Sequence, residues 1–312
     1  MFRRCGPALL LLALCATPAP AGERLAKKVL FIGIDGCRPD AIPAAVEAVN
    51  LHALIKEGAY SDKTDVLGDR KTGADTATGP GWASALTGVW ADRHGVTDNA
   101  FRTPHFDQYP TFFRRLKESR PNAVTVALVT WLPFKEHYFP ASDGCRLVLD
   151  GDKKGYLDGE RAVAKDAVKV LGETDLDAAF VYFGNVDSAG HGYGFHPKSP
   201  RYTKEIETVD GYIGDILKAL RARPTYAKED WLVIVCTDHG GQGRGHGAGE
   251  KVPESRTGFL ILHGPSVEKG TIEGKTYNVD VAATALTHLG VAIKPEWKLD
   301  GRPVGLKKAS VP

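Results

Sequence analysis

The feature that most constrains this chain is an apolar run that ends abruptly in metal-ligating side chains. Residues 231–235 read WLVIV, and Asp238, His239 and His246 follow around a glycine-rich turn. A continuous apolar run is typical of a strand in a parallel sheet that is buried on both faces. In such sheets ligands collect at the carboxyl ends of the strands, and Asp and His are ligands that zinc accepts. The pattern therefore predicts a buried strand that delivers metal ligands.

Two further apolar runs end in the same way. Residues 29–34 lead directly into Asp35, and residues 178–183 lead into Asp187, with His191 four positions later. One acid after a strand is commonly part of a polar turn, but three acids after three strands indicate a shared site. Six ligands suit two zinc ions with three protein groups each, which leaves positions for a nucleophile and a substrate. The candidate ligands are Asp35, Asp187, His191, Asp238, His239 and His246.

The remaining patterns place these strands in an α/β protein. Apolar residues recur at helical spacing in four segments, and two more strands are expected. The helical segments are 39–59, 160–171, 206–220 and 280–289, and the additional strands are 124–130 and 258–263. Strands that alternate with helices predict a three-layer α/β/α sandwich with a largely parallel central sheet. We expect a single domain over residues 22–312, with the aromatic-rich residues 90–160 as a candidate substrate-lining insertion.

The first 21 residues have the pattern of a secretory signal peptide. Two arginines precede an apolar run from Ala8 to Ala16, and residues 19–21, APA, offer a small-residue cleavage site. The run is short for a transmembrane helix. Lipidation of Cys15 is disfavoured because the large side chain of Leu14 precedes it. We therefore expect export, to the periplasm or beyond, and no stable membrane partner.

Charge and cysteine content exclude several classes of protein. The 40 basic residues lose two with the leader and then match the 38 acidic ones, so the mature chain is formally neutral. A neutral chain without clustered basic residues argues against a nucleic-acid polymer as partner. Three widely spaced cysteines, Cys37, Cys145 and Cys236, do not form a disulfide framework, although a pair that includes Cys145 stays open. The oligomeric state is left open by the sequence.

A short helix is expected to begin near Thr78. Residues 76–82 read TATGPGW, and a proline near the first helical position places Thr78 at the amino end of the helix. Free backbone N–H groups at such an end favour an anion. A simple N-cap is the plainer interpretation of Thr78. A zinc ion that lowers the pKa of bound water from 15.7 to about 7 would also make a threonine alkoxide accessible, which makes Thr78 the candidate nucleophile.

Together these elements resemble the alkaline phosphatase superfamily and, within it, the nucleotide pyrophosphatase/phosphodiesterase branch. The matching segments are Ile34-Asp35-Gly36, Thr78-Gly79-Pro80, Leu86-Thr87-Gly88 with His94-Gly95, Asp187 to His191, Thr237 to Gly240, and Asp280 with Leu289-Gly290. The resemblance implies one zinc ion held by Asp187, His191 and His246. It implies a second ion, or another divalent metal, held by Asp35, Asp238, His239 and the Thr78 oxygen. It also implies a two-step reaction through a phospho-threonine intermediate.

The chain departs from this branch beside the nucleophile. Members usually read Thr-Phe-Pro-Asn, whereas this chain reads Thr78-Gly79-Pro80-Gly81. The missing aromatic ring removes a stacking partner for a nucleobase, and the missing asparagine removes a donor to a phosphoryl oxygen. The amides of Gly79 or Gly81 and the Asn99 side chain are candidates for that donor. In many relatives the last zinc histidine lies farther downstream, so His263 and His288 are alternatives to His246.

The resemblance implies an exported two-zinc hydrolase of small phosphoric esters, with phosphodiesters or nucleotide pyrophosphates as leading substrates. Phosphomonoesters are the nearest alternative, which a positive group near Thr78, such as Arg70 or Lys71, would favour. Phosphonate hydrolysis would use the same ligands. A non-catalytic metal-binding envelope protein is the alternative from another class. A sulfatase is disfavoured because Ala41 stands where the signature that begins at Cys37 needs arginine.

Overall fold

A nine-stranded sheet forms the middle of the molecule in the computed structural model, which describes residues 25–308. The strands are β1 (Ala26–Ile34), β2 (Ala59–Asp65), β3 (Thr125–Val129), β4 (Cys145–Leu147), β5 (Ala178–Phe183), β6 (Glu229–Cys236), β7 (Thr257–His263), β8 (Gly270–Thr271) and β9 (Thr276–Tyr277). Their order is β4-β3-β5-β1-β6-β7-β2-β8, and β9 pairs with β2. The signal peptide expected in residues 1–21 lies outside the described residues.

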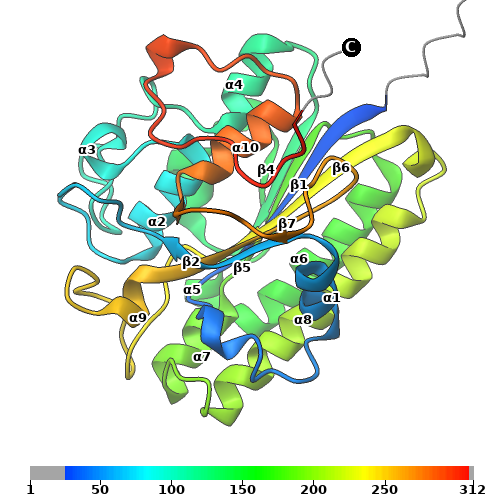
Figure 1. Ribbon diagram of the computed structural model, residues 1–312. Coiled ribbons are helices and arrows are strands. Elements are labelled where there is room, and N and C mark those ends of the chain that lie inside the picture. The colour runs from blue at the N-terminus through cyan, green and yellow to red at the C-terminus, as the bar shows by residue number, and fades with distance from the viewer. Residues whose placement is uncertain (1–24, 309–312) are drawn as a thin grey trace, which may run out of the picture.

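Helices cover both faces of this sheet, as Figure 1 shows. They are α1 (Val49–Glu57), α2 (Thr78–Thr87), α3 (Ala91–His94), α4 (Phe112–Ser119), α5 (Gly151–Lys154), α6 (Tyr156–Glu173), α7 (Asn185–Tyr193), α8 (Pro200–Arg221), α9 (Pro253–Arg256) and α10 (Asp280–His288). Buried residues of α2, α4 and α10 pack against one face of the sheet, and those of α1, α6 and α8 pack against the other. The expected three-layer α/β/α sandwich is confirmed.

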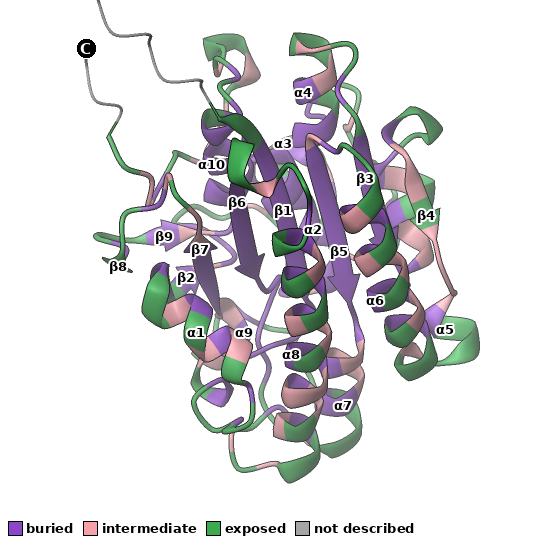
Figure 2. Ribbon diagram, turned by 90° about the vertical axis from the view of Figure 1, so that its right-hand side faces the viewer, coloured by how far each residue is buried: buried purple, intermediate pink, exposed green. Residues whose placement is uncertain are grey.

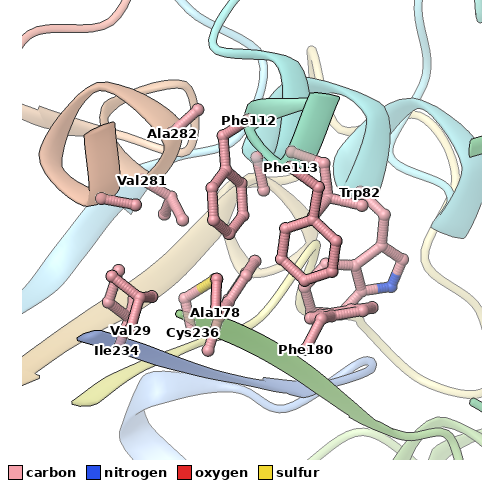
Figure 3. Packing of buried hydrophobic residues seen from close by; sticks show 14 of the residues in the cluster. Val29, Trp82, Phe112, Phe113, Ala178, Phe180, Ile234, Cys236, Val281 and Ala282 are labelled. Carbon is pink, nitrogen blue, oxygen red and sulfur yellow. The ribbon is translucent and has the colours of Figure 1, made fainter. Parts of the chain in front are cut away.

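The central strands are buried on both faces, which explains their continuous apolar sequences. In β1 the side chains of Val29 and Phe31 belong to the core beneath α2 and α4, whereas Leu30 and Ile32 belong to the core beneath α6 and α8. Figure 2 shows these strands as buried along their length, while the helices expose their outer faces. Figure 3 shows how aromatic rings, with Trp82 among them, fill the first core. Two cores therefore hold the middle strands rigidly.

The middle of the sheet is parallel, as the sequence predicts. β1 pairs in parallel with β5 on one side and with β6 on the other. β3 also pairs in parallel with β5, whereas β7 runs antiparallel to β6 and to β2. The carboxyl ends of β5, β1 and β6 consequently lie next to one another at one edge of the sheet. Residues 90–160 contribute β3 and β4 to this sheet and α4 to its cover.

The sequence-based prediction of a helix over residues 39–59 is correct only for its second half. The helix α1 begins at Val49, and the preceding residues form a short 3-10 turn at Pro39–Ala41 followed by irregular turns. Pro43 lacks the N–H group that a helix starting at residue 39 needs at its fifth position. Val46 and Val49, which were expected on the apolar face, are 68% and 60% exposed.

Two properties bear on the remaining expectations from the sequence. Cys37, Cys145 and Cys236 are all free thiols, so the disulfide left open for Cys145 is not formed. Within residues 25–308, no helix combines the length and the apolar character needed to cross a membrane.

Candidate active site

The three acids expected at strand ends meet at the shared edge of β5, β1 and β6. Asp35 directly follows β1, Asp238 lies two residues after β6, and Asp187 lies in the first turn of α7, which follows β5. His239 Nε2 lies 3.4 Å from Asp35 Oδ1 and 3.3 Å from Asp238 Oδ2. One oxygen or nitrogen of each of these three residues lies within 4.8 Å of the others. This group matches one of the two ligand sets expected from the sequence.

A second group of ligand atoms lies beside the first. Asp187, His239 and His246 bring their ligand atoms within 4.8 Å of one another. Asp187 Oδ1 is 4.0 Å from His246 Nε2, and Asp187 Oδ2 is 3.3 Å from His191 Nε2. His191 and His246 have ring centroids 5.0 Å apart. His191 thus lies beside Asp187 and His246, whereas the third member of the compact group is His239, which belongs to both groups.

The three histidines are oriented by their backbone surroundings. His191 Nδ1 lies 2.9 Å from the carbonyl oxygen of Arg244, His239 Nδ1 lies 2.8 Å from that of Gly240, and His246 Nδ1 lies 2.7 Å from that of Thr76. A carbonyl oxygen accepts a hydrogen bond, so each Nδ1 is the donor. The Nε2 atoms of His239 and His246 then carry a lone pair, whereas Nε2 of His191 donates a hydrogen bond to Asp187. Such contacts fix the tautomer and the ring orientation of metal-ligating histidines.

Several buried polar atoms at this edge have no hydrogen-bond partner among the described residues. They are Asp35 Oδ1, Asp187 Oδ1, Asp238 Oδ2 and His239 Nε2. Buried polar atoms are normally paired, because each unpaired one costs free energy. These atoms are the ones that point into the two ligand groups, and carboxylate oxygens with imidazole nitrogens suit zinc. The residues present thus fit a pair of metal ions.

The other oxygen of Asp35 is held by two donors from the surrounding core. Trp82 Nε1 donates to Asp35 Oδ2 at 3.1 Å, and the Tyr182 hydroxyl donates to the same oxygen at 2.7 Å. This arrangement leaves Oδ1 alone to face His239. Sequence analysis missed both donors, because an aromatic residue in an apolar segment gives no sign that its polar atom reaches a carboxylate.

Two of the buried acids in the site lack a positive partner. Burial, followed by the charge of Asp187, raises the pKa of Asp35 to about 6. Burial and the charges of Asp35 and Asp187 raise the pKa of Asp238 well above its usual value. Within the described chain, no lysine or arginine forms an ion pair with any of these acids. The hydrogen bond from His191 outweighs burial and lowers the pKa of Asp187. Divalent metal ions would supply the positive charge that Asp35 and Asp238 lack and would allow both to ionise.

The histidines differ in charge when no metal is present. Burial and the charge of His239 lower the pKa of His246 to about 4, which keeps its imidazole neutral and ready to bind a metal. The hydrogen bond to Asp187 raises the pKa of His191 to about 9. A metal ion at Asp187 would therefore have to displace a proton from His191.

Thr78 is the first residue of α2, the helix whose Trp82 donates to Asp35. Ala77 occupies the N-cap position, and the Thr78 side chain makes no capping hydrogen bond, so the plainer interpretation as an N-cap is wrong. Residues three and four positions apart share a helix face. On this face a Cβ atom at Gly81 would lie 2.7 Å from Asp238 Cβ, and Trp82 donates to Asp35. The same face therefore presents the buried Thr78 to both acids.

The neighbours of Thr78 explain the two glycines that depart from the family pattern. A Cβ atom at Gly79 would lie 3.0 Å from Asn99 Oδ1 and 3.2 Å from Phe101 Cζ. The space beside Gly79 is thus filled by residues 98–101, and the space beside Gly81 is filled by Asp238. A side chain at either position would displace these neighbours.

The two glycine amides are not free to bind a substrate. Gly79 N donates to Asn99 Oδ1 at 2.7 Å, and Gly81 N donates to the Ala77 carbonyl oxygen at 3.0 Å. This corrects the expectation that either amide serves as the donor. Because Asn99 Oδ1 faces the Gly79 amide, its Nδ2 group points elsewhere, and within residues 25–308 it has no acceptor.

The alternative ligands lie away from the centre. His263 lies beside Glu57, and His288 contacts the Asp230 carbonyl oxygen, so neither replaces His246. His94 is buried and contacts Ser84, and burial lowers its pKa to about 3. His105 contacts the Arg93 carbonyl oxygen. His137 stacks on Phe101 with ring centroids 4.4 Å apart.

The structure also changes the interpretation of two other residues. Arg70 forms ion pairs with Asp92 and Asp300, so it does not supply the positive group expected beside Thr78. Cys37 is fully buried, and burial holds the pKa of its thiol far above the ordinary value, which fits the rejection of the sulfatase signature.

Helix α7 is a functional element that the sequence analysis did not identify. No helix was expected between residues 184 and 193, where Gly184, Gly190 and Gly192 lower helix propensity. The signal that could have revealed the helix is the spacing of four residues between Asp187 and His191, which places both side chains on one helical face.

The fold and the site define an alkaline-phosphatase-like α/β protein with a candidate two-metal centre. A family model described as type I phosphodiesterase/nucleotide pyrophosphatase matches residues 29–244, which include most of β1, all of β2 to β6 and all but one of the candidate ligands. The chain therefore belongs to the type I phosphodiesterase/nucleotide pyrophosphatase family. His246, the one ligand outside the match, lies two residues beyond its end.

Relatives and solved structures agree with this assignment. Ectonucleotide pyrophosphatase/phosphodiesterase family member 7 from Rattus norvegicus is 25% identical over 264 residues, which cover 75% of this chain and 54% of the relative. The chain thus spans about half the length of the curated relatives it matches. A solved murine ectonucleotide pyrophosphatase/phosphodiesterase 5 in complex with AMP has a TM-score of 0.63 at 16% identity, covering 86% of this chain and 96% of that one. A phosphonate monoester hydrolase from Silicibacter pomeroyi has a TM-score of 0.62 at 17% identity, covering 89% and 75%.

Proposed function

We propose that this protein is an exported two-zinc hydrolase of phosphoric esters that acts on phosphodiesters or nucleotide pyrophosphates. The observation that carries the proposal is the set of unpartnered atoms on Asp35, Asp238 and His239 beside the helix face that begins with Thr78. Family membership supports the class of reaction. The murine neighbour is an inactive threonine-to-alanine variant in complex with AMP, which supports a threonine at the centre of the reaction.

The six ligands divide into two sets in this proposal. Asp187, His191 and His246 hold one zinc ion. Asp35, Asp238 and His239 hold the other, together with the Thr78 oxygen. Bound zinc supplies Lewis-acid polarisation of a phosphoryl oxygen and lowers the pKa of a coordinated hydroxyl group. Trp82 and Tyr182 keep Asp35 Oδ1 directed at the centre by binding its other oxygen.

Thr78 is the nucleophile in this proposal. Its Oγ1 atom forms a bond to phosphorus while the bond between phosphorus and the leaving alcohol breaks, and the proton of the Thr78 hydroxyl leaves with that alcohol. Water then attacks the same phosphorus and frees Thr78, which completes the hydrolysis. The amino end of α2 favours the anionic phosphoryl group that Thr78 carries between the two steps.

Asn99 is the donor to a phosphoryl oxygen in this proposal. Its Oδ1 atom is held by the Gly79 amide, next to Thr78 in the chain. The carboxamide can therefore turn only its Nδ2 group toward a substrate, and Nδ2 has no acceptor within the described chain. Asn99 lies on a loop 21 residues after Thr78 and takes the part that the usual motif assigns to a residue of the helix.

Turnover of two nitrophenyl esters tests the proposal. We expect the purified, zinc-loaded protein to cleave p-nitrophenyl thymidine monophosphate faster than p-nitrophenyl phosphate. Thr78→Ala should abolish both reactions and keep the zinc. Thr87→Ala is a matched control at the other end of α2, where the Thr87 hydroxyl donates to the Ala83 carbonyl oxygen and accepts from the Val89 amide; it should keep its activity.

The other outcomes separate the alternatives. A preference for the monoester would place the protein with the phosphatases, although Arg70 is paired away from the site. Cleavage of a phosphonate ester alone would favour the activity named for the Silicibacter neighbour. If no ester is cleaved faster by the unaltered protein than by Thr78→Ala, the protein binds metal without catalysis. Export is checked by mass spectrometry, which should find Gly22 at the start of the mature chain.

A further inference from the structure

A network of hydrogen bonds links the segment before the nucleophile to the loop that carries His246. The Asp75 carboxylate accepts hydrogen bonds from Ala248 N at 2.9 Å and from Gly249 N at 3.1 Å. It also accepts one from Thr76 N at 2.8 Å. Asp75 thus ties together residues 75–76 and residues 246–249, which we call the Asp75 network.

Thr76 links the same segment directly to the candidate metal ligand His246. Its carbonyl oxygen accepts a hydrogen bond from His246 Nδ1 at 2.7 Å, and its hydroxyl donates to the His246 carbonyl oxygen. The first of these bonds turns His246 Nε2 toward Asp187. Thr76 lies two residues before Thr78, so one short segment orients a ligand of one metal and leads into the nucleophile.

The fit between the two segments is close. A Cβ atom at Gly249 would lie 2.2 Å from Thr76 Cγ2, and one at Gly247 would lie 3.1 Å from Asp75 Oδ2. Ala248 has a φ of 61°, a left-handed conformation that a residue with a side chain adopts at a cost. Glycine also loses more backbone freedom on ordering than other residues. Something must therefore hold this loop in place, and Asp75 provides the acceptors for its amides.

We propose that Asp75 is a positioning residue that couples metal binding at His246 to the placement of Thr78. The inference rests on the proposed function and names a residue that touches neither the metal ligands nor the substrate. Without Asp75, the binding free energy of the metal at His246 has to order the glycine-rich loop as well. Loss of such an outer contact typically lowers metal affinity by about 10- to 100-fold.

Zinc affinity measured by chelator competition tests the coupling. Asp75→Asn and Asp75→Ala should weaken one of the two zinc equivalents by about 10- to 100-fold and leave the other unchanged. Gly249→Ala should do the same while Asp75 stays in place, because its Cβ atom would push against Thr76. Asp210→Asn is the matched control. Asp210 accepts the amides of Asn50 and Leu51 at the start of α1, far from the centre in sequence and fold.

Hydrogen exchange gives a second readout that does not depend on turnover. In the unaltered protein, zinc should slow exchange of the amides in residues 76–79 as well as in residues 246–249. In the Asp75 variants both segments should exchange faster at low zinc, and saturating zinc should restore their protection together. The Asp210 variant should unfold at a lower temperature and show neither effect.

Three results would count against these claims in different ways. Equal weakening of both zinc equivalents, or protection that returns in residues 246–249 without residues 76–79, would overturn the coupling alone. Unchanged zinc affinity in both Asp75→Ala and Gly249→Ala would reduce the network to a structural contact. If the unaltered protein binds no zinc, the proposed function fails, and the coupling fails with it.

Discussion

The two ends of the central strands differ in whether their buried charged side chains have partners within the protein. At the amino ends, Lys28 of β1 donates to Asp175 at 2.6 Å and to the Leu176 carbonyl oxygen at 2.7 Å. Glu229 of β6 accepts hydrogen bonds from Arg223 with both of its oxygens, at 2.9 Å each. Trp231 Nε1 adds another hydrogen bond to Glu229 at 2.7 Å. Lys28 and Glu229 are thus paired within the protein, whereas the neighbouring Asp230 accepts a hydrogen bond from Ser266 with one oxygen and keeps the other without a partner in the described chain.

At the carboxyl ends of the same strands, buried acids and a histidine keep polar atoms without hydrogen-bond partners. Asp35, Asp238 and His239 are as deeply buried as Glu229, yet each keeps an atom without a partner in the described chain. An unpaired buried charge costs several kcal/mol, so it persists where a ligand repays the cost. The comparison teaches that burial alone does not distinguish a structural charge from a functional one. The distinction lies in whether the hydrogen-bonding capacity of the group is already used.

Asp238→Asn gives the largest expected effect and the sharpest test of this contrast. It should cost the zinc-loaded protein about 4 kcal/mol in transition-state stabilisation, roughly a thousandfold in kcat/KM, because a metal ligand is lost. In the presence of a chelator, the same change should leave the free energy of unfolding equal or higher. Burial raises the pKa of Asp238, so keeping this carboxyl buried costs stability at neutral pH, and asparagine does not carry that cost. Steady-state kinetics of the zinc-loaded protein measures the loss in kcat/KM, and urea unfolding in the presence of a chelator measures the free energy of unfolding. A chelated variant less stable than the chelated parent would contradict the contrast.

Glu229→Gln should behave in the opposite way. It breaks a buried ion pair, and removing one partner of such a pair costs about 3 kcal/mol of unfolding free energy. The loss should be the same with zinc and with a chelator, and kcat should not change below the unfolding temperature. Denaturant unfolding beside a zinc titration checks this. A zinc-dependent loss would show that the two ends of the strands are not independent.

Much of the fold and of the site follows from patterns in the sequence. The central residues of β1, β5, β6 and β7 form apolar runs, and burial on both faces requires this composition. The acids that follow three of these runs meet because neighbouring parallel strands end at one edge. Local sequence therefore predicts the ligands wherever a strand places them directly.

The remaining features depend on contacts between distant segments. Strand β2 was missed because its sequence, AYSDKTD, carries charges and is held by pairing with β7. The role of Gly79 is visible only where residues 98–101 fill the space beside it. Asp75 lies in a polar stretch without periodicity, and its importance arises from amides 173 and 174 residues later in the chain. No local pattern carries that information.

Asn99→Ala should have a smaller effect than either strand-end substitution. A hydrogen bond to a charged group contributes about 2 kcal/mol, so kcat/KM should fall about 30-fold. Zinc content should not change, because Asn99 touches no candidate ligand. Asp98→Ala is the matched control for disturbance of the loop, since Asp98 accepts the Ala100 amide. If both variants lose activity equally, the shape of the loop matters and the Asn99 carboxamide does not.

The smallest expected effect is the acid dependence of stability that Glu229 contributes. Burial opposes its ionisation, but hydrogen bonds from Arg223, Trp231 and Thr225 dominate and lower its pKa to about 2. A carboxylate whose folded-state pKa lies below the unfolded value of about 4.3 stabilises the protein above that pH and ceases to do so as the pH falls toward 2. The difference in unfolding free energy between the parent and Glu229→Gln should therefore be constant above pH 5 and shrink steadily below pH 4.

Measuring that difference in the presence of a chelator isolates the amino ends of the strands. The stability that Asp35 contributes depends on pH in the opposite direction, because its folded-state pKa is raised to about 6. This contribution is fully present below pH 4 and is lost as the pH rises through 6. Because both proteins contain Asp35, its contribution cancels in the difference. A difference that stays constant down to pH 2.5 would show that Glu229 does not titrate as a paired charge. In that case Glu229 would not be a paired structural charge, and the contrast between the two ends of the strands would not hold.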